Sequence, residues 1–136
     1  MVKLIMGLKG AGKTAQLVQD INEAVKNETG SMVCIEKGTK LRYDIDMRVR
    51  LIEYQEYMMG DLASFKGFIS GLHAGNFDIS HIFIDSFYKL VENGTMETVE
   101  EFVLWCDKFG SANSIDFTIL VSEDPALASE TLQKYM

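Results

Sequence analysis

The sequence has little proline and cysteine and no long hydrophobic run. It contains one proline and two cysteines in 136 residues. Cys34 and Cys106 both lie inside apolar patterns, which predicts buried free thiols rather than a disulfide or a metal site. A membrane-spanning helix needs about 20 consecutive apolar residues, and the apolar runs of this sequence are far shorter. Residues 1–6 also lack the basic region and the long apolar region of a secretory signal. These absences predict a cytoplasmic protein without a transmembrane helix.

Basic residues are also in the minority. The chain has 13 Lys and Arg against 20 Asp and Glu, a formal net charge of −7. Non-specific nucleic-acid binding requires a broad basic surface, so nucleic acid is not the expected partner. The charge is uneven, because residues 1–50 carry nine basic and six acidic side chains, whereas residues 51–136 carry four and fourteen. This distribution predicts a compact anionic ligand near the N-terminus.

The composition itself is that of a globular domain, with 47% hydrophobic and 24% charged residues. The length predicts one domain over residues 1–136. Strands are predicted at residues 2–6, 32–35, 82–84 and 115–121, and helices at residues 13–27, 62–72 and 96–106 and from Pro125 onward. Either Thr95 or Thr98 is expected to cap the third helix. Alternating strands and amphipathic helices predict an α/β fold, with three α/β/α layers around a mainly parallel sheet.

Residues 39–54 follow a different pattern. Apolar and polar residues alternate strictly from Lys40 to Leu51, which is typical of extended chain with one solvated face. The run is long for one strand, so a break or hairpin is expected near residues 44–46, with residues 49–54 as the favoured sheet member. The sequence therefore predicts an extended or hairpin insertion around residues 39–54.

A glycine-rich segment follows the first predicted strand. The pattern G-x-x-x-x-G-K-[ST] of a phosphate-binding loop is matched by residues 7–14, Gly-Leu-Lys-Gly-Ala-Gly-Lys-Thr. Glycines allow successive backbone N–H groups to point into one concavity, and the helix that follows adds the positive end of its dipole. Such a string also arises by chance in turns, but the strand before it and the helix after it favour a nucleotide site.

The residue types in this segment suit phosphate chemistry. Lys13 is predicted to reach the β- and γ-phosphates, and Thr14 is predicted to bind Mg²⁺. Lys9 is either an exposed loop charge or an additional phosphate contact. The predicted phosphate-binding residues are Gly7, Lys9, Gly10, Ala11, Gly12, Lys13, Thr14 and Ala15.

An acidic residue ends another buried strand. The apolar run of residues 82–84 leads directly into Asp85 and Ser86. Many buried strands end in Asp for reasons of turn formation or capping. In a protein with a phosphate-binding loop, however, an aspartate at this place holds Mg²⁺. The pairing with residues 7–14 therefore predicts Asp85 and Thr14 as metal-site residues.

These segments together resemble the P-loop NTPases, and within them the RecA/KaiC-like core. The matching segments are GLKGAGKT at residues 7–14, IFIDS at residues 82–86 and TILVSE at residues 118–123. The resemblance implies a catalytic glutamate at the end of the strand after the first helix, which is Glu36 here, and a γ-phosphate sensor at Ser122. The alternative interpretation of Glu36 is a solvated residue at the end of a strand. In that case Glu53 or Glu56 would be the candidate catalytic base. The alternative interpretation of Ser122 is a residue that only precedes a helix.

Three arginines and two histidines remain. Arg42, Arg48 and Arg50 lie in the alternating segment, where one could act as an arginine finger in cis or toward a neighbouring subunit, or all three could serve solubility. His73 and His81 have no partners at metal-ligand spacing in the sequence, so structural roles are expected.

These observations predict a small cytoplasmic ATP-binding protein with Mg²⁺-dependent ATPase activity, in which Lys13 and Glu36 take part in catalysis. It is expected to act with a protein partner or as a homo-oligomer. No N-K-x-D guanine motif occurs, which favours adenine. The alternative is a nucleotide-dependent binding module or switch without hydrolysis. A small-molecule kinase is less favoured, because no arginine-rich lid is visible and little chain remains for an acceptor site.

Overall fold

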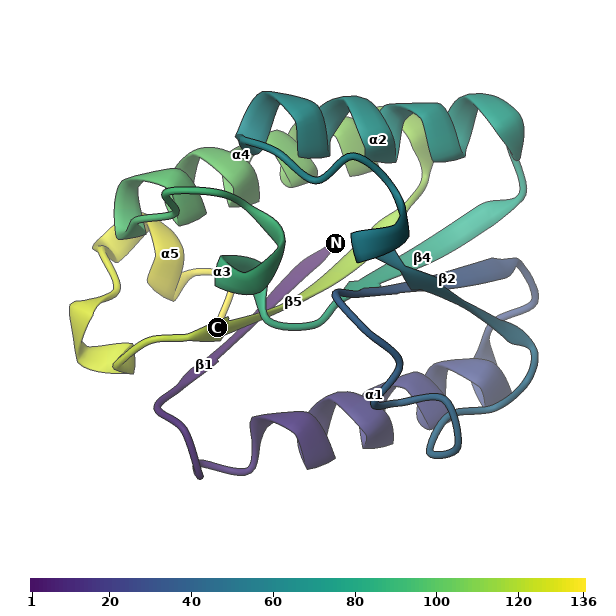
Figure 1. The fold of residues 1–136 in the computed structure, drawn as a ribbon, viewed down its shortest axis with the longest axis horizontal. Coiled ribbons are helices and arrows are strands. Elements are labelled where there is room, and N and C mark those ends of the chain that lie inside the picture. The colour runs from purple at the N-terminus through teal and green to yellow at the C-terminus, as the bar shows by residue number, and fades with distance from the viewer.

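A central parallel sheet organises the chain, of which the computed structural model describes residues 1–136 (Figure 1). The strands are β1 (Val2–Gly7), β2 (Ser31–Glu36), β3 (Val49–Glu53), β4 (Ile79–Ile84) and β5 (Asp116–Ser122). Their order is β1-β5-β4-β2-β3, and every neighbouring pair is parallel. The predicted parallel sheet is confirmed, and the carboxyl ends of all its strands meet at one edge.

Helices cover both faces of the sheet. α1 (Lys13–Asn27) lies on one face, and α2 (Leu62–Gly75) and α4 (Met96–Asn113) lie on the other (Figure 1). The other helical segments are short, and they are η1 (Tyr54–Glu56), α3 (Phe87–Leu90), η2 (Pro125–Leu127) and α5 (Glu130–Gln133). None of the helices combines the length and the apolar composition that a membrane span requires.

An apolar core lies on each face because successive side chains of a strand point to opposite sides of the sheet. Met32 and Cys34 of β2 belong to the cluster beneath α1. Val33 and Ile35 belong to the larger cluster beneath α2 and α4. Cys34 and Cys106 are both buried free thiols, as predicted. Burial of β2 on both faces explains its continuous apolar run.

Residues 39–48 do not form the predicted extended or hairpin insertion. They form turns, and only β3 from the predicted segment joins the sheet, as a parallel edge strand beside β2. The carboxylate of Glu36 accepts hydrogen bonds from the backbone N–H groups of Lys40 and Leu41, at 2.9 and 3.3 Å. This bends the chain and buries Leu41 in the α1 cluster. Tyr43 and Met47, by contrast, are 92% and 99% exposed, so the alternation did not reflect a sheet face.

The structure also shows which residues cap two of the predicted helices at their amino ends. Thr95, not Thr98, is the N-cap of α4, and the Thr98 side chain completes the capping box from inside the helix. Asp124 caps the segment that begins at Pro125, but this segment is one 3₁₀ turn rather than the predicted helix. A second short helix, α5, begins after Ser129.

Candidate functional site

The glycine-rich loop, residues 7–14, joins the carboxyl end of β1 to α1. Gly10 and Gly12 have φ angles of 89° and 83°, a left-handed conformation that side chains other than glycine rarely adopt. At Gly7 a Cβ atom would lie 2.9 Å from the Cβ of Ala11. The glycines are therefore needed for the tight path of this loop.

The amino end of α1 is open to an anion. Gly12 precedes the helix and has no side chain to cap it, and the first turn holds no acidic residue. The first N–H groups of a helix have no intrahelical partners and carry partial positive charge. The Lys13 ammonium lies over the loop and donates to the Leu8 carbonyl oxygen at 3.1 Å. Backbone and side-chain positive charge thus converge at one place.

A cavity of about 600 Å³, here called the loop cavity, opens at this place. Its lining includes most of the predicted phosphate-binding residues, namely Lys9, Gly10, Gly12, Lys13, Thr14 and Ala15. β5 contributes Ser122, because β5 pairs directly with β1 and ends beside it. Gly7 and Ala11 do not line the cavity. The structure therefore places Ser122, which the resemblance implied as a γ-phosphate sensor, beside the loop.

A second cavity of about 340 Å³, here called the carboxylate cavity, lies at the same edge of the sheet. Glu36 and Asp85 line it, because β2 and β4 are neighbours and both end there. No apolar residue lines it, and the other lining residues are Lys37, Gly38, Lys40, Gln55, Ser86 and Lys89. Ser86 and Lys89 also line the loop cavity, so the two cavities share a wall.

Asp85 is a buried carboxylate, only 8% exposed. Ser86 donates its hydroxyl to Asp85 Oδ1 at 3.2 Å, and no Lys or Arg lies within ion-pair distance. Burial raises the pKa of Asp85, and the more distant charges of Lys89, Lys40 and Lys13 offset this in part. A desolvated carboxylate without a paired cation is the kind of group that a divalent cation would stabilise.

This burial predicts that Asp85→Asn increases the free energy of unfolding at neutral pH by about 1 kcal/mol. The raised pKa means that the folded state binds the proton more tightly than the unfolded state. Wild-type stability therefore falls as the pH rises above the ordinary carboxyl pKa, and the variant escapes this loss. Urea unfolding at pH 7 and below pH 4 measures the difference, which should vanish at the lower pH. Asp44→Asn, on an exposed loop, is the matched control.

Glu36 is held more firmly than a solvated strand-end residue, with an exposed fraction of 3%. Its two carboxylate oxygens accept the bonds from Lys40 and Leu41 described above. Burial raises its pKa, and these two backbone hydrogen bonds partly oppose the shift. Each carboxylate oxygen can accept more than one hydrogen bond, so Glu36 keeps acceptor capacity while it fixes the following loop.

The alternative bases are not brought to this site. Glu53 and Glu56 line a separate cavity of about 290 Å³, together with Arg42 and Arg50. Gln55, between the two glutamates, is the residue that reaches the carboxylate cavity, and its Nε2 donates to Glu53 Oε1 at 2.7 Å. Glu36 is therefore the glutamate placed beside Asp85.

The arginines do not reach the loop cavity. Arg48 donates to the carbonyl oxygens of Val25, Glu28 and Gly30 at 2.7, 2.6 and 3.1 Å, which places it at the carboxyl end of α1. Arg48 therefore cannot act as an arginine finger on the loop of its own chain, because it lies at the carboxyl end of α1 and the loop lies at the amino end. Arg42 is exposed and lines only the separate cavity.

Lys89 and Ser86 line both cavities, although the sequence pattern assigned neither of them a role at the site. Ser86 has φ 58°, an uncommon value for a residue with a side chain, and it begins the four-residue helix α3. Lys89 lies on that helix, between the two cavities. A helix of one turn leaves no periodicity to detect. The only sequence feature that links Lys89 to the site is its position four residues after Asp85.

The chain matches no protein-family model and no curated protein sequence.

Proposed function

We propose that this protein binds ATP with Mg²⁺ through residues 7–14 and hydrolyses it slowly, as a minimal P-loop NTPase of the RecA/KaiC-like type. One observation carries the proposal: the glycine-rich loop opens into a cavity lined by Lys13, Thr14 and Ser122, and this cavity shares a wall with the one that holds Asp85 and Glu36. Phosphate ligands and a metal-binding carboxylate are required side by side for this chemistry.

The loop supports the binding of the phosphates. Lys13 and the first N–H groups of α1 supply positive charge, and the loop cavity of about 600 Å³ leaves room for a polyphosphate. Lys9 is exposed at the rim, where it adds charge. The absence of a guanine motif supports adenine.

The residues around Asp85 fit a divalent cation. Thr14 would bind Mg²⁺ through its hydroxyl and Asp85 through bound water, and the ion would neutralise charge that develops on the phosphates. The fit is supported by the buried state of Asp85, which has no paired cation of its own.

Hydrolysis requires a base and a charge that stabilises the transition state. Glu36 is our candidate for the residue that polarises the attacking water, since it lines the same cavity as Asp85. Lys89, between the two cavities, is the candidate for the second role in cis. A partner or a second copy of the chain could supply an arginine instead, and Arg42 and Arg50 are exposed for such a role.

A nucleotide-dependent switch without turnover is the second candidate. It is favoured by the two backbone hydrogen bonds to Glu36, which tie this carboxylate to the 37–41 loop. In this version the bound nucleotide would alter that loop, and a partner would recognise the change.

Single-turnover ATP hydrolysis with the protein in excess tests the two functions. We expect slow, Mg²⁺-dependent product formation that Asp85→Asn reduces by at least about tenfold, the scale of one lost charged contact. Asp44→Asn should behave as wild type. Repeating the assay over a range of protein concentrations would reveal a site shared between subunits, because the rate would then rise with concentration. Tight ATP binding without product would favour the switch, and no ATP binding would remove both functions.

A further inference from the structure

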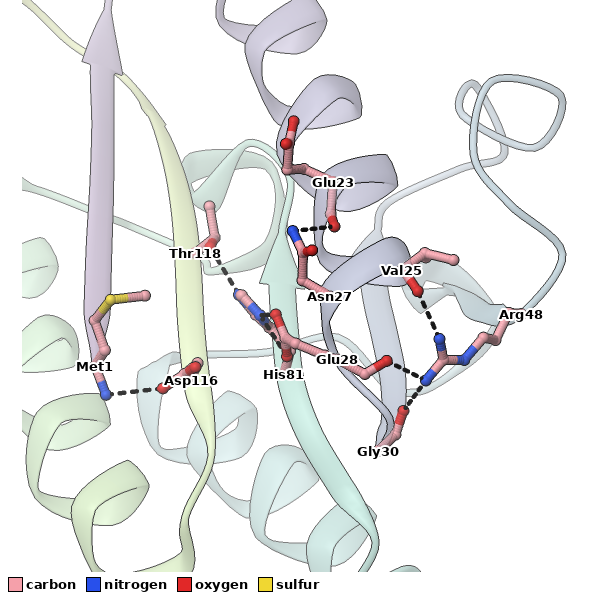
Figure 2. A network of polar contacts seen from close by, with 10 residues as sticks. All are labelled: Met1, Glu23, Val25, Asn27, Glu28, Gly30, Arg48, His81, Asp116 and Thr118. Atoms are coloured by element: carbon pink, nitrogen blue, oxygen red, sulfur yellow. Dashed lines mark hydrogen bonds and ion pairs between the residues drawn. The ribbon is translucent and has the colours of Figure 1, made fainter.

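A second polar cluster lies at the opposite end of α1 from the glycine-rich loop. It consists of Glu28, His81 and Asp116, each of which offers a ligand atom within 4.8 Å of the others (Figure 2). Glu28 is the C-cap of α1, and the register of β4 and β5 pairs His81 with Asp116. Three segments distant in the sequence therefore converge, which explains why the sequence offered no ligand spacing for His81.

The imidazole of His81 is held in the manner of a metal ligand. Its Nε2 lies 2.9 Å from the hydroxyl oxygen of Thr118, and its Nδ1 lies 3.0 and 3.3 Å from the two Glu28 carboxylate oxygens (Figure 2). His81 is 5% exposed, and its ring stacks on Phe83 with ring centroids 3.9 Å apart. Metal-binding histidines use one ring nitrogen while a hydrogen bond at the other fixes the ring.

The backbone that carries Glu28 is also fixed. The Arg48 guanidinium donates to the carbonyl oxygens of Val25, Glu28 and Gly30, and so clamps the chain where α1 ends (Figure 2). A ligand on a backbone pinned in this way loses little conformational entropy when it binds an ion. Arg48, which does not serve the nucleotide site, thus has a role at this cluster.

The cluster is accessible and carries excess negative charge. A hollow of about 220 Å³ borders it, lined among others by Glu28, His81 and Thr118, with Asp20 and Glu23 nearby. The hollow leaves space for water ligands.

The positive groups at this hollow are already engaged. The ammonium of Lys3 is paired with Asp20 at 2.7 Å. The Met1 nitrogen lies 3.0 Å from Asp116 Oδ1, and Asp116 Oδ2 takes part in no hydrogen bond or ion pair. These contacts leave Glu28 with His81 as its only close partner in the cluster.

We propose that His81 Nδ1 and one carboxylate oxygen each from Glu28 and Asp116 bind a single divalent transition-metal ion, with Zn²⁺ as the best match. One imidazole with carboxylates suits Zn²⁺, whereas Mg²⁺ and Ca²⁺ prefer oxygen ligands alone. Three protein ligands leave a position for water. α1 has 15 residues and is about 22 Å long, so this site is separate from the nucleotide site.

Zn²⁺ titration of chelator-treated, nucleotide-free protein by calorimetry tests the proposal. We expect one equivalent to bind, and Co²⁺ in its place to show visible d–d absorption. Glu28→Gln and Asp116→Asn should each weaken Zn²⁺ binding by at least about 10- to 100-fold. These positions are partly exposed, so the variants test the site even where replacement of the buried His81 would impair folding. His73→Gln and Asp85→Asn are the controls and should bind Zn²⁺ as wild type does.

Either of two results would overturn the metal site. One is the absence of a one-equivalent Zn²⁺ complex in the wild-type protein. The other is unchanged affinity in Glu28→Gln and Asp116→Asn, or a loss confined to Asp85→Asn, which would assign the ion to the carboxylate cavity. Neither result bears on ATP binding, and Lys13→Ala should leave Zn²⁺ binding intact, so the two proposals fail independently.

Discussion

Replacing Lys13 with alanine is expected to weaken Mg²⁺·ATP binding by about 10- to 100-fold. A hydrogen bond to a charged group contributes about 1.5–3 kcal/mol, and the Lys13 ammonium lies over the loop and lines its cavity. In the absence of ligand its one hydrogen bond is to the Leu8 carbonyl oxygen. Because alanine is favourable in a helix, the fold should be unaffected. Titration with a fluorescent ATP analogue gives the affinity, and the melting temperature checks the fold.

Lys9→Ala is the matched control for this experiment. Lys9 belongs to the same loop and lines the same cavity, but it is exposed at the rim. Its removal subtracts one positive charge and should lower the affinity by only about two- to threefold, since exposed charges interact weakly. Equal effects of the two substitutions would mean that the loop acts by net charge alone. An unchanged affinity in Lys13→Ala would contradict the phosphate-binding role of residues 7–14.

Replacing Glu36 should have a large effect on stability. Glu36→Ala removes the acceptor for the backbone N–H groups of Lys40 and Leu41, and leaves the Leu41 N–H without a partner in a buried position and the Lys40 N–H without one in a partly buried position. An unsatisfied buried donor costs about 1–3 kcal/mol, and the Lys40 N–H adds less because water can reach it, so the free energy of unfolding should fall by roughly 2–4 kcal/mol. Glu36→Gln keeps one acceptor oxygen and should lose about half as much. Denaturant unfolding at pH 7 measures both variants.

The same pair of variants separates a structural role of Glu36 from a catalytic one. If Glu36 polarises the attacking water, Glu36→Gln should lower the single-turnover rate of ATP hydrolysis by about 10²- to 10⁴-fold. ATP affinity should stay near that of wild type, because Glu36 does not line the loop cavity. Glu53→Gln is the control, since that glutamate lies in another cavity. A Glu36→Gln variant that is less stable but hydrolyses ATP at the wild-type rate would confine Glu36 to its structural role.

Local patterns predicted well wherever an element is both regular and long. The apolar spacing of α1 and its start at Lys13 were readable, since the glycine-rich loop ends there and one helical face is buried. The alternation in residues 40–51 misled, because strict alternation is equally compatible with turns in which one residue, Leu41, is buried. What bends that segment is Glu36, whose hydrogen bonds to Lys40 and Leu41 have no apolar signature.

The sequence alone determined the layered α/β class, the parallel sheet and the candidate phosphate loop, because these depend on periodicity and on short contiguous motifs. Only the tertiary structure decided which distant residues meet. The strand order β1-β5-β4-β2-β3 places Ser122 beside the loop and Glu36 beside Asp85, and the β4–β5 register places His81 beside Asp116. Strand order and register follow from the packing of the whole sheet, so no local pattern encodes these juxtapositions.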